Sequence, residues 1–145
     1  MPLHLIKLSV GVDSVEQLGE LIQHRLAEKR QRKEPAEHVH TTRVLPKRAA
    51  EILGGGSIFW VIRRQVAARQ EILDLRPVVG ADGIGRCQIV LAPALTPVLP
   101  RPHRPFQGWR YLRHDDAPPD LTPQTGALAD MPEAMRRELR ELGLI

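Results

Sequence analysis

The stretch richest in chemical groups interleaves aromatic rings with arginines. It reads RPHRPFQGWRYLRH and covers residues 101–114. Aromatic rings stack on nucleic-acid bases and guanidinium groups bind phosphates, so this alternation is typical of a nucleic-acid surface, where each stacked base contributes roughly 1–3 kcal/mol. Gln107 can donate and accept hydrogen bonds, and Gly108 permits close backbone approach. The residues that we expect to bind a ligand here are Arg104, Gln107, Trp109 and Arg110.

The same block has a structural interpretation. A proline-rich segment often fixes itself to a domain by burying its aromatic side chains. We therefore expect Phe106 and one of Trp109 and Tyr111 in the core. We expect Trp109 to be partly buried, with Arg104 and Arg110 on the functional surface.

A second cluster of hydroxyls and cations lies near the start of a short helix. Thr41 and Thr42 precede Arg43, and Lys47 and Arg48 follow closely. The unpaired N–H groups and the dipole of a helix N-terminus favour a phosphate there, which makes Arg43, Lys47 and Arg48 candidate ligand-binding residues. Ordinary helix capping is the alternative.

A charged pair interrupts an apolar strand. Alternation places Arg69 and Glu71 on one face, and if that face is buried the two need partners, because an isolated buried charge is costly. They would then line a pocket, with Glu71 as general base and Lys47 as a neighbouring cation. An exposed cross-strand ion pair is the alternative.

Other catalytic and metal signals are weak, and we predict no catalytic residue, no metal and no cofactor. His38 and His40 would need a third ligand such as His4 or His103, for which no spacing selects. The glycines before Ser57 close a helix, unlike a phosphate loop, and no G-x-S-x-G elbow surrounds this serine. The lone Cys87 opens an apolar strand and reads as an inert buried thiol.

These residues must be positioned by a mixed set of elements. Apolar spacing after a capping box at Ser14 and Gln17 predicts a helix over 14–30, and a short second helix precedes the glycines at 54–56. Strands are expected at 3–12, 57–62, 66–79, 87–92 and 95–99, with 109–112 as a further candidate. We expect one α+β domain over 1–145: a small curved antiparallel sheet or barrel of five to six strands with an N-terminal, a short second and a C-terminal helix. A proline-rich strap should cover 100–131 and the last helix 132–145.

The charge is unevenly distributed. The chain has 145 residues and a net charge of +4, but residues 38–114 carry twelve basic against four acidic side chains, a balance of +8, together with all five aromatic residues. Eleven of those twelve cations are arginine. A GC-rich genome also produces a high arginine content, and charges spread over a small domain are also typical of an ordinary solvated face. A single cysteine and an N-terminus without a signal or a membrane span predict a cytoplasmic protein that does not enter membranes.

The segments HTTRVLPKR, GGSIFWVI, ARQEILDLRP and RPFQGWRYL followed by APPDL resemble domain of unknown function 1489, a bacterial family known mainly from alphaproteobacteria. That family has no established activity. The helix, glycines and arginine-bearing strand at 48–70 are also similar to the opening of PUA-like domains such as the ASCH and EVE groups. This second resemblance implies a small barrel that binds RNA or modified bases.

These observations together predict an RNA-binding or other polyanion-binding module. One alternative is an enzyme that acts on a small modified nucleoside-like ligand. Another is a scaffold that binds a protein partner through the C-terminal helix.

Overall fold

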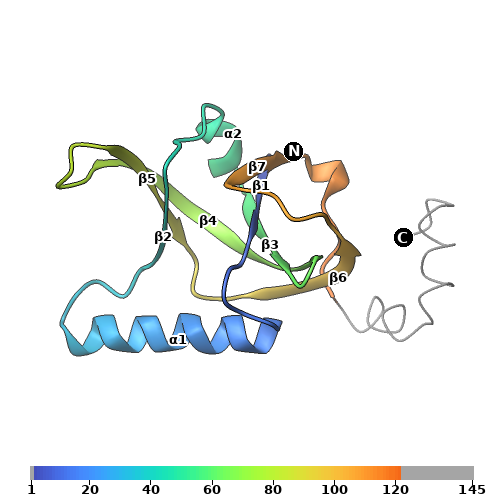
Figure 1. The fold of residues 1–145 in the computed structure, drawn as a ribbon, viewed down its shortest axis with the longest axis horizontal. Coiled ribbons are helices and arrows are strands. Elements are labelled where there is room, and N and C mark those ends of the chain that lie inside the picture. The colour runs from blue at the N-terminus through green and yellow to red at the C-terminus, as the bar shows by residue number, and fades with distance from the viewer. Residues whose placement is uncertain (1, 122–145) are drawn as a thin grey trace, which may run out of the picture.

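The computed structural model describes residues 2–121, which form a bent, mixed sheet with a long helix beside it (Figure 1). The elements in chain order are β1 (His4–Leu8), α1 (Val15–Gln31), β2 (His38–Thr42), α2 (Ala49–Leu53), β3 (Ser57–Ile62), β4 (Gln65–Val79), β5 (Gly85–Leu91), β6 (Thr96–Pro102), β7 (Trp109–Leu112) and the 3₁₀ turn η1 (His114–Asp116). The strand order is β2-β5-β4-β3-β1-β7, and β6 pairs with β4. The predicted α+β class is confirmed, whereas the C-terminal helix predicted at 132–145 lies outside the described residues.

The sheet is mixed because β1 and β3 run parallel. Leu5 is opposite Ile58 and Leu8 is opposite Val61. The connection between these strands contains α1, β2 and α2, and a connection of this length can return the chain to the same end of the sheet. The prediction of an all-antiparallel sheet is therefore wrong at this pair, and the prediction of five to six strands omitted β2.

The capping box predicted for α1 is present. The Ser14 hydroxyl accepts a hydrogen bond from the Gln17 backbone N–H at 3.1 Å, and the Gln17 side chain accepts one from the Asp13 N–H at 2.6 Å. The first bond satisfies a donor that the first turn of a helix leaves unpaired, and the second ties the residue before the N-cap to that turn. Three residues on one face of α1 are buried: Leu18, Ile22 and Leu26.

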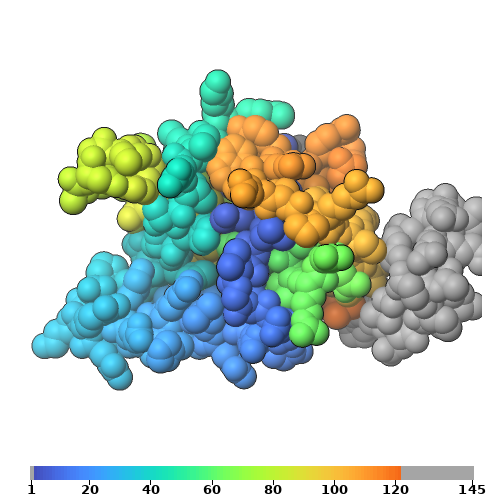
Figure 2. All heavy atoms as spheres, viewed as in Figure 1, coloured from blue at the N-terminus to red at the C-terminus, as the bar shows by residue number. Residues whose placement is uncertain are grey.

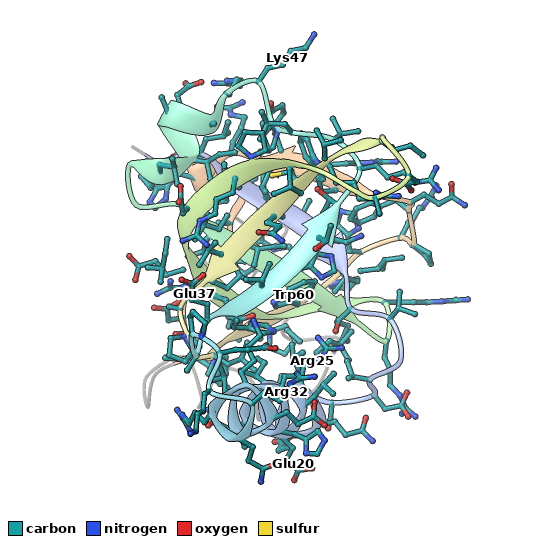
Figure 3. All side chains as sticks on the ribbon, turned by 90° about the vertical axis from the view of Figure 1, so that its left-hand side faces the viewer. Glu20, Arg25, Arg32, Glu37, Lys47 and Trp60 are labelled. Carbon is teal, nitrogen blue, oxygen red and sulfur yellow. The ribbon has the colours of Figure 1, made fainter. Side chains whose placement is uncertain are left out.

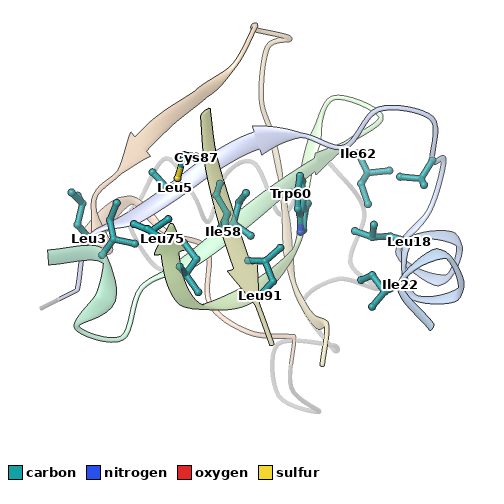
Figure 4. Packing of buried hydrophobic residues seen from close by; sticks show 14 of the residues in the cluster. Leu3, Leu5, Leu18, Ile22, Ile58, Trp60, Ile62, Leu75, Cys87 and Leu91 are labelled. Carbon is teal, nitrogen blue, oxygen red and sulfur yellow. The ribbon is translucent and has the colours of Figure 1, made fainter. Parts of the chain in front are cut away.

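Strand β3 is buried on both faces, which explains its unbroken apolar sequence SIFWVI. Ile58, Trp60 and Ile62 face the larger core cluster, which includes the buried side of α1 (Figure 4). Phe59 and Val61 face a smaller cluster that contains Phe106. The central strand therefore packs against both layers of the core.

The sheet does not close into a barrel. Strands β2 and β7 are the two ends of the strand order, and no backbone ladder joins them in the described chain. Two side chains of β7 bond the segment that follows β2: Trp109 Nε1 donates to the Val44 carbonyl at 3.0 Å, and the Arg48 N–H donates to the Tyr111 hydroxyl at 3.1 Å. The barrel alternative is therefore wrong, and the seam between β2 and the β1–β7 edge is held by side chains.

Gly56 allows α2 to pack closely on the first strand. A Cβ at this position would clash with the carbonyl oxygens of Leu3 and Ile52. We predict that Gly56→Ala lowers the free energy of unfolding by about 1–3 kcal/mol, the usual effect of forced overpacking. Gly19→Ala on α1 is the control: its Cβ meets nothing within 4 Å and should raise stability by about 0.5–1 kcal/mol. Urea denaturation of both variants measures the difference, and equal effects would contradict this explanation.

Candidate nucleic-acid interface

Two pockets meet at Lys7 on the seam between β1 and β2. The first, the histidine pocket, has a volume of about 140 Å³ and lies between α1, β1, β2 and β3. The second, the tryptophan pocket, has a volume of about 530 Å³ and lies between the end of β2 and the start of β7. Figure 2 shows the segments of β1 in dark blue, β2 in teal and β7 in orange meeting on one face, above α1. Because Lys7 lines both pockets, we treat them as one surface and call it the basic groove.

The histidine pocket brings cations together with an imidazole. Lys7 comes from β1, Arg25 from α1 and His40 from β2, while the Trp60 ring lies edge to face with His40 at a centroid distance of 5.4 Å. In Figure 3 the Arg25 side chain lies between α1 and Trp60. Burial, followed by the charges of Lys7 and Arg25, lowers the pKa of His40 to about 4. At neutral pH, His40 is therefore uncharged beside two cations.

His38, two residues earlier on the same strand, belongs to a structural network. Trp60 Nε1 donates to Gln70 Oε1 at 3.0 Å, so the amide nitrogen of Gln70 donates to both His38 Nδ1 at 3.0 Å and the Ala92 carbonyl at 2.9 Å. Gln70 is fully buried, and this network anchors β2 across β4 and β3. Burial, followed by the charge of Arg25, lowers the pKa of His38 to about 4.

The tryptophan pocket combines one half-buried ring with exposed polar groups. Trp109 is held through its Nε1 bond to the Val44 carbonyl and by edge-to-face packing with Tyr111 at 4.9 Å. Gln107 and Arg43 are exposed at its rim. The other lining residues are Lys7, Thr41, Thr42, Val44 and Gly108. The ring is fixed before any ligand arrives, which reduces the conformational entropy lost on binding.

The structure brings three of the predicted ligand-binding residues into the groove and leaves six outside. Arg43, Gln107 and Trp109 line the tryptophan pocket. Lys47 points away from the body of the molecule (Figure 3), and Glu71 is exposed on β4. The remaining four are arginines engaged elsewhere or exposed: Arg48 pairs with Glu51, Arg69 with Asp120, Arg110 lies 4.8 Å over the Phe106 ring, and Arg104 is exposed.

Within the described chain, the cations of the groove are not paired with carboxylates, unlike several arginines elsewhere on the surface. Arg76 pairs with Glu37 and Asp74, and Arg86 pairs with Asp82. Over residues 2–121, by contrast, Lys7, Arg25 and Arg43 form no ion pair within 4.0 Å. The uncompensated positive charge of the described chain therefore includes three side chains on one groove.

Sequence reasoning missed Lys7, Arg25 and Trp60, and it considered His40 only as a metal ligand. A signal for Arg25 was present: it follows Leu18 and Leu21 at helical spacing and so falls on the stripe that faces the sheet. Lys7 likewise shares a face of β1 with buried Leu5. A lone cation at a position that periodicity assigns to the core is the pattern to look for.

A separate polar pocket of about 430 Å³ surrounds His4. The Ser57 backbone N–H donates to His4 Nδ1 at 3.0 Å, so the proton of the neutral ring is on Nε2, which donates to His114 Nδ1 at 3.0 Å. The Ser57 hydroxyl accepts from Arg69, whose guanidinium also binds both carboxylate oxygens of Asp120 at 2.6 and 2.9 Å. Neither ring nitrogen of His4 is bonded to the Ser57 hydroxyl, so the arrangement does not activate this serine as a nucleophile.

Arg69 forms an ion pair with Asp120, and Glu71 forms no ion pair within 4.0 Å over residues 2–121. The partner of Arg69 is Asp120, which raises the pKa of the guanidinium through their hydrogen bond. Cys87 is buried, and burial raises the pKa of its thiol, in agreement with an unreactive side chain. The described chain holds no group of three or more His, Cys, Asp or Glu side chains that could bind a metal ion. None of its helices is both long and apolar enough to span a membrane.

Residues 5–145 match the family described as Protein of unknown function (DUF1489). The chain belongs to this family. The match covers nearly the whole sequence and confirms the resemblance seen in its arginine and aromatic motifs. No curated protein and no solved structure matches the chain.

Buried neutral histidines make stability depend on pH in a defined direction. Burial, followed by the charge of His114, lowers the pKa of His4 from its usual 6.5 to about 4. The unfolded chain therefore binds protons more readily than the folded chain, and the free energy of unfolding should fall as pH decreases from about 6.5 to about 4. His4→Asn, which keeps an acceptor near Nδ1 but does not titrate, should make this decline shallower. Thermal melts at several pH values test it.

The control is His24→Asn, because the His24 side chain is 70% exposed on α1. It should not make the decline shallower. If both variants retained the full decline, His4 would not be one of the groups that cause it.

Proposed function

We propose that the protein binds single-stranded RNA along the basic groove. The observation that carries the proposal is the meeting of two pockets at Lys7, with phosphate-binding cations on one side and a fixed aromatic ring on the other. Single-stranded nucleic acids are held by a charged path for the backbone and aromatic surfaces for the bases. The groove offers both.

Each part of the groove suits one part of an RNA strand. Lys7, Arg25 and Arg43 have charge available for phosphates, because no carboxylate of the described chain neutralises them. Trp109 offers a stacking surface and Gln107 an amide that can bond a base edge. The exposed Thr41 hydroxyl can bond a ribose 2′-hydroxyl, which favours RNA over DNA.

Two broader expectations accompany this proposal. A PUA-like relationship stays a prediction from the resemblance at 48–70, because the sheet of the described residues does not close into the barrel that this relationship implies. A cytoplasmic location is supported by the single cysteine, which is buried and suits a reducing compartment. The enzymatic alternative has less support, since the His4 pocket leaves Ser57 without a base and Glu71 lies outside it.

Salt dependence tests the role of the cations. We predict that RNA affinity falls as salt rises, and that Arg43→Ala lowers the slope of log K against log salt by about 0.7, the value per phosphate contact on a single strand. Arg86→Ala is the control: it removes the same charge but from an arginine that Asp82 already neutralises. Its slope should equal that of the parent protein. Fluorescence anisotropy with a labelled RNA strand provides the measurement, and a flat salt dependence of the parent would reject phosphate contacts.

Paired substitutions of Trp109 test stacking. Both Trp109→Ala and Trp109→Phe lose the hydrogen bond to Val44, so only the ring distinguishes them. The alanine variant should bind RNA more weakly than the phenylalanine variant by about 1–3 kcal/mol. Circular dichroism establishes that both are folded, and equal affinities would show that no base stacks on this ring.

A further inference from the structure

His40 has an unsatisfied polar atom inside the histidine pocket. Its Nε2 is buried and has no hydrogen-bond partner, and no other side-chain atom of the described residues shares this state. Buried polar atoms in folded proteins are nearly always hydrogen-bonded. His38, on the same strand, meets this rule through Gln70. Because the His40 side chain lines the pocket, its unsatisfied nitrogen favours a ligand that supplies the missing partner.

The charges of the pocket define the chemistry of that ligand. Lys7 comes from β1 and Arg25 from α1, and no acidic residue lines the pocket. Burial and then these two cations disfavour the protonated form of His40, and the lining residues offer no negative charge to offset Lys7 and Arg25. An anion would bind both cations and would accept a hydrogen bond from His40, which gains a proton more easily once the anion is present.

We propose that the histidine pocket binds a terminal phosphate of the RNA strand. The volume of about 140 Å³ suits one group of phosphate size. A phosphomonoester carries close to two negative charges, which match Lys7 and Arg25, whereas an internal phosphodiester carries one and must continue the strand on both sides. This inference rests on the proposed function, because Lys7 also lines the tryptophan pocket, where a base near that end of the strand would stack.

The experiment compares RNA strands of one sequence that differ only at their ends. Internally labelled strands with a 5′-phosphate, a 3′-phosphate or hydroxyls at both ends are titrated into the full chain. One phosphorylated strand should bind at least about tenfold more tightly than the hydroxyl strand, in keeping with charge-assisted hydrogen bonds to the phosphate. Equal affinity of all three strands would overturn this inference and leave the proposed function standing.

Variants of the pocket separate recognition from folding. Arg25→Ala and His40→Phe should remove the preference for the phosphorylated end, while Arg30→Ala, which changes the same helix outside both pockets, should keep it. His40→Phe retains a ring beside Trp60 and removes the unpartnered nitrogen, so its melting temperature should not fall. A preference that survives in both pocket variants would place the phosphate elsewhere and reject the proposal.

Inorganic phosphate and a nucleoside monophosphate, titrated by calorimetry, distinguish the source of the phosphate. If no RNA strand binds but either small ligand does, and Arg25→Ala abolishes that binding, the pocket takes a free phosphate and the proposed RNA terminus is wrong. If nothing binds, both the proposed function and this inference fail.

Discussion

The unpaired seam between β2 and the β1–β7 edge is the constraint on which the groove depends. A closed ladder would satisfy the backbone groups of both edges and leave no space between them. Here the edges are held apart, with hydrogen bonds from Trp109 and to Tyr111 at one end and the packing of α1 at the other. Both pockets of the groove lie along this seam. The proposed binding surface therefore arises from an incomplete sheet and needs no dedicated loop.

Gln70 keeps the seam at a fixed width. It is fully buried and uses its amide oxygen for Trp60 and its amide nitrogen for His38 and Ala92. Buried polar networks of this kind strongly favour one arrangement, because any shift leaves a polar group without a partner. The network holds β2 by His38, so the position of His40 two residues later is fixed as well. Structural order at His38 thus fixes the neighbouring histidine of the proposed site.

Local sequence patterns predicted most elements, while long-range pairing lay beyond them. Apolar spacing and a capping box predicted helix α1, and an apolar run predicted β3, because these signals lie in residues close together in the sequence. The parallel pairing of β1 with β3 and the strand at His38–Thr42 depend on distant partners that no local period records. The site follows the same division. The cluster of Gln107 and Trp109 was visible as composition, whereas Lys7, Arg25 and His40 are single residues on three elements that the fold alone brings together.

Arginine content alone misjudges where this protein can bind an anion. Arg69 pairs with Asp120 and Arg76 pairs with Glu37, and these partners lie 51 and 39 positions away in the sequence. A count of charges within one segment does not reveal such pairs. An exposed ion pair contributes little to stability, but its carboxylate competes with any phosphate for the guanidinium. A cation that folding leaves without a carboxylate is free of this competition. Lys7 and Arg25 meet that condition in a pocket that is also lined by His40, whose buried Nε2 lacks a partner, so electrostatics and hydrogen bonding both support the anion site proposed there.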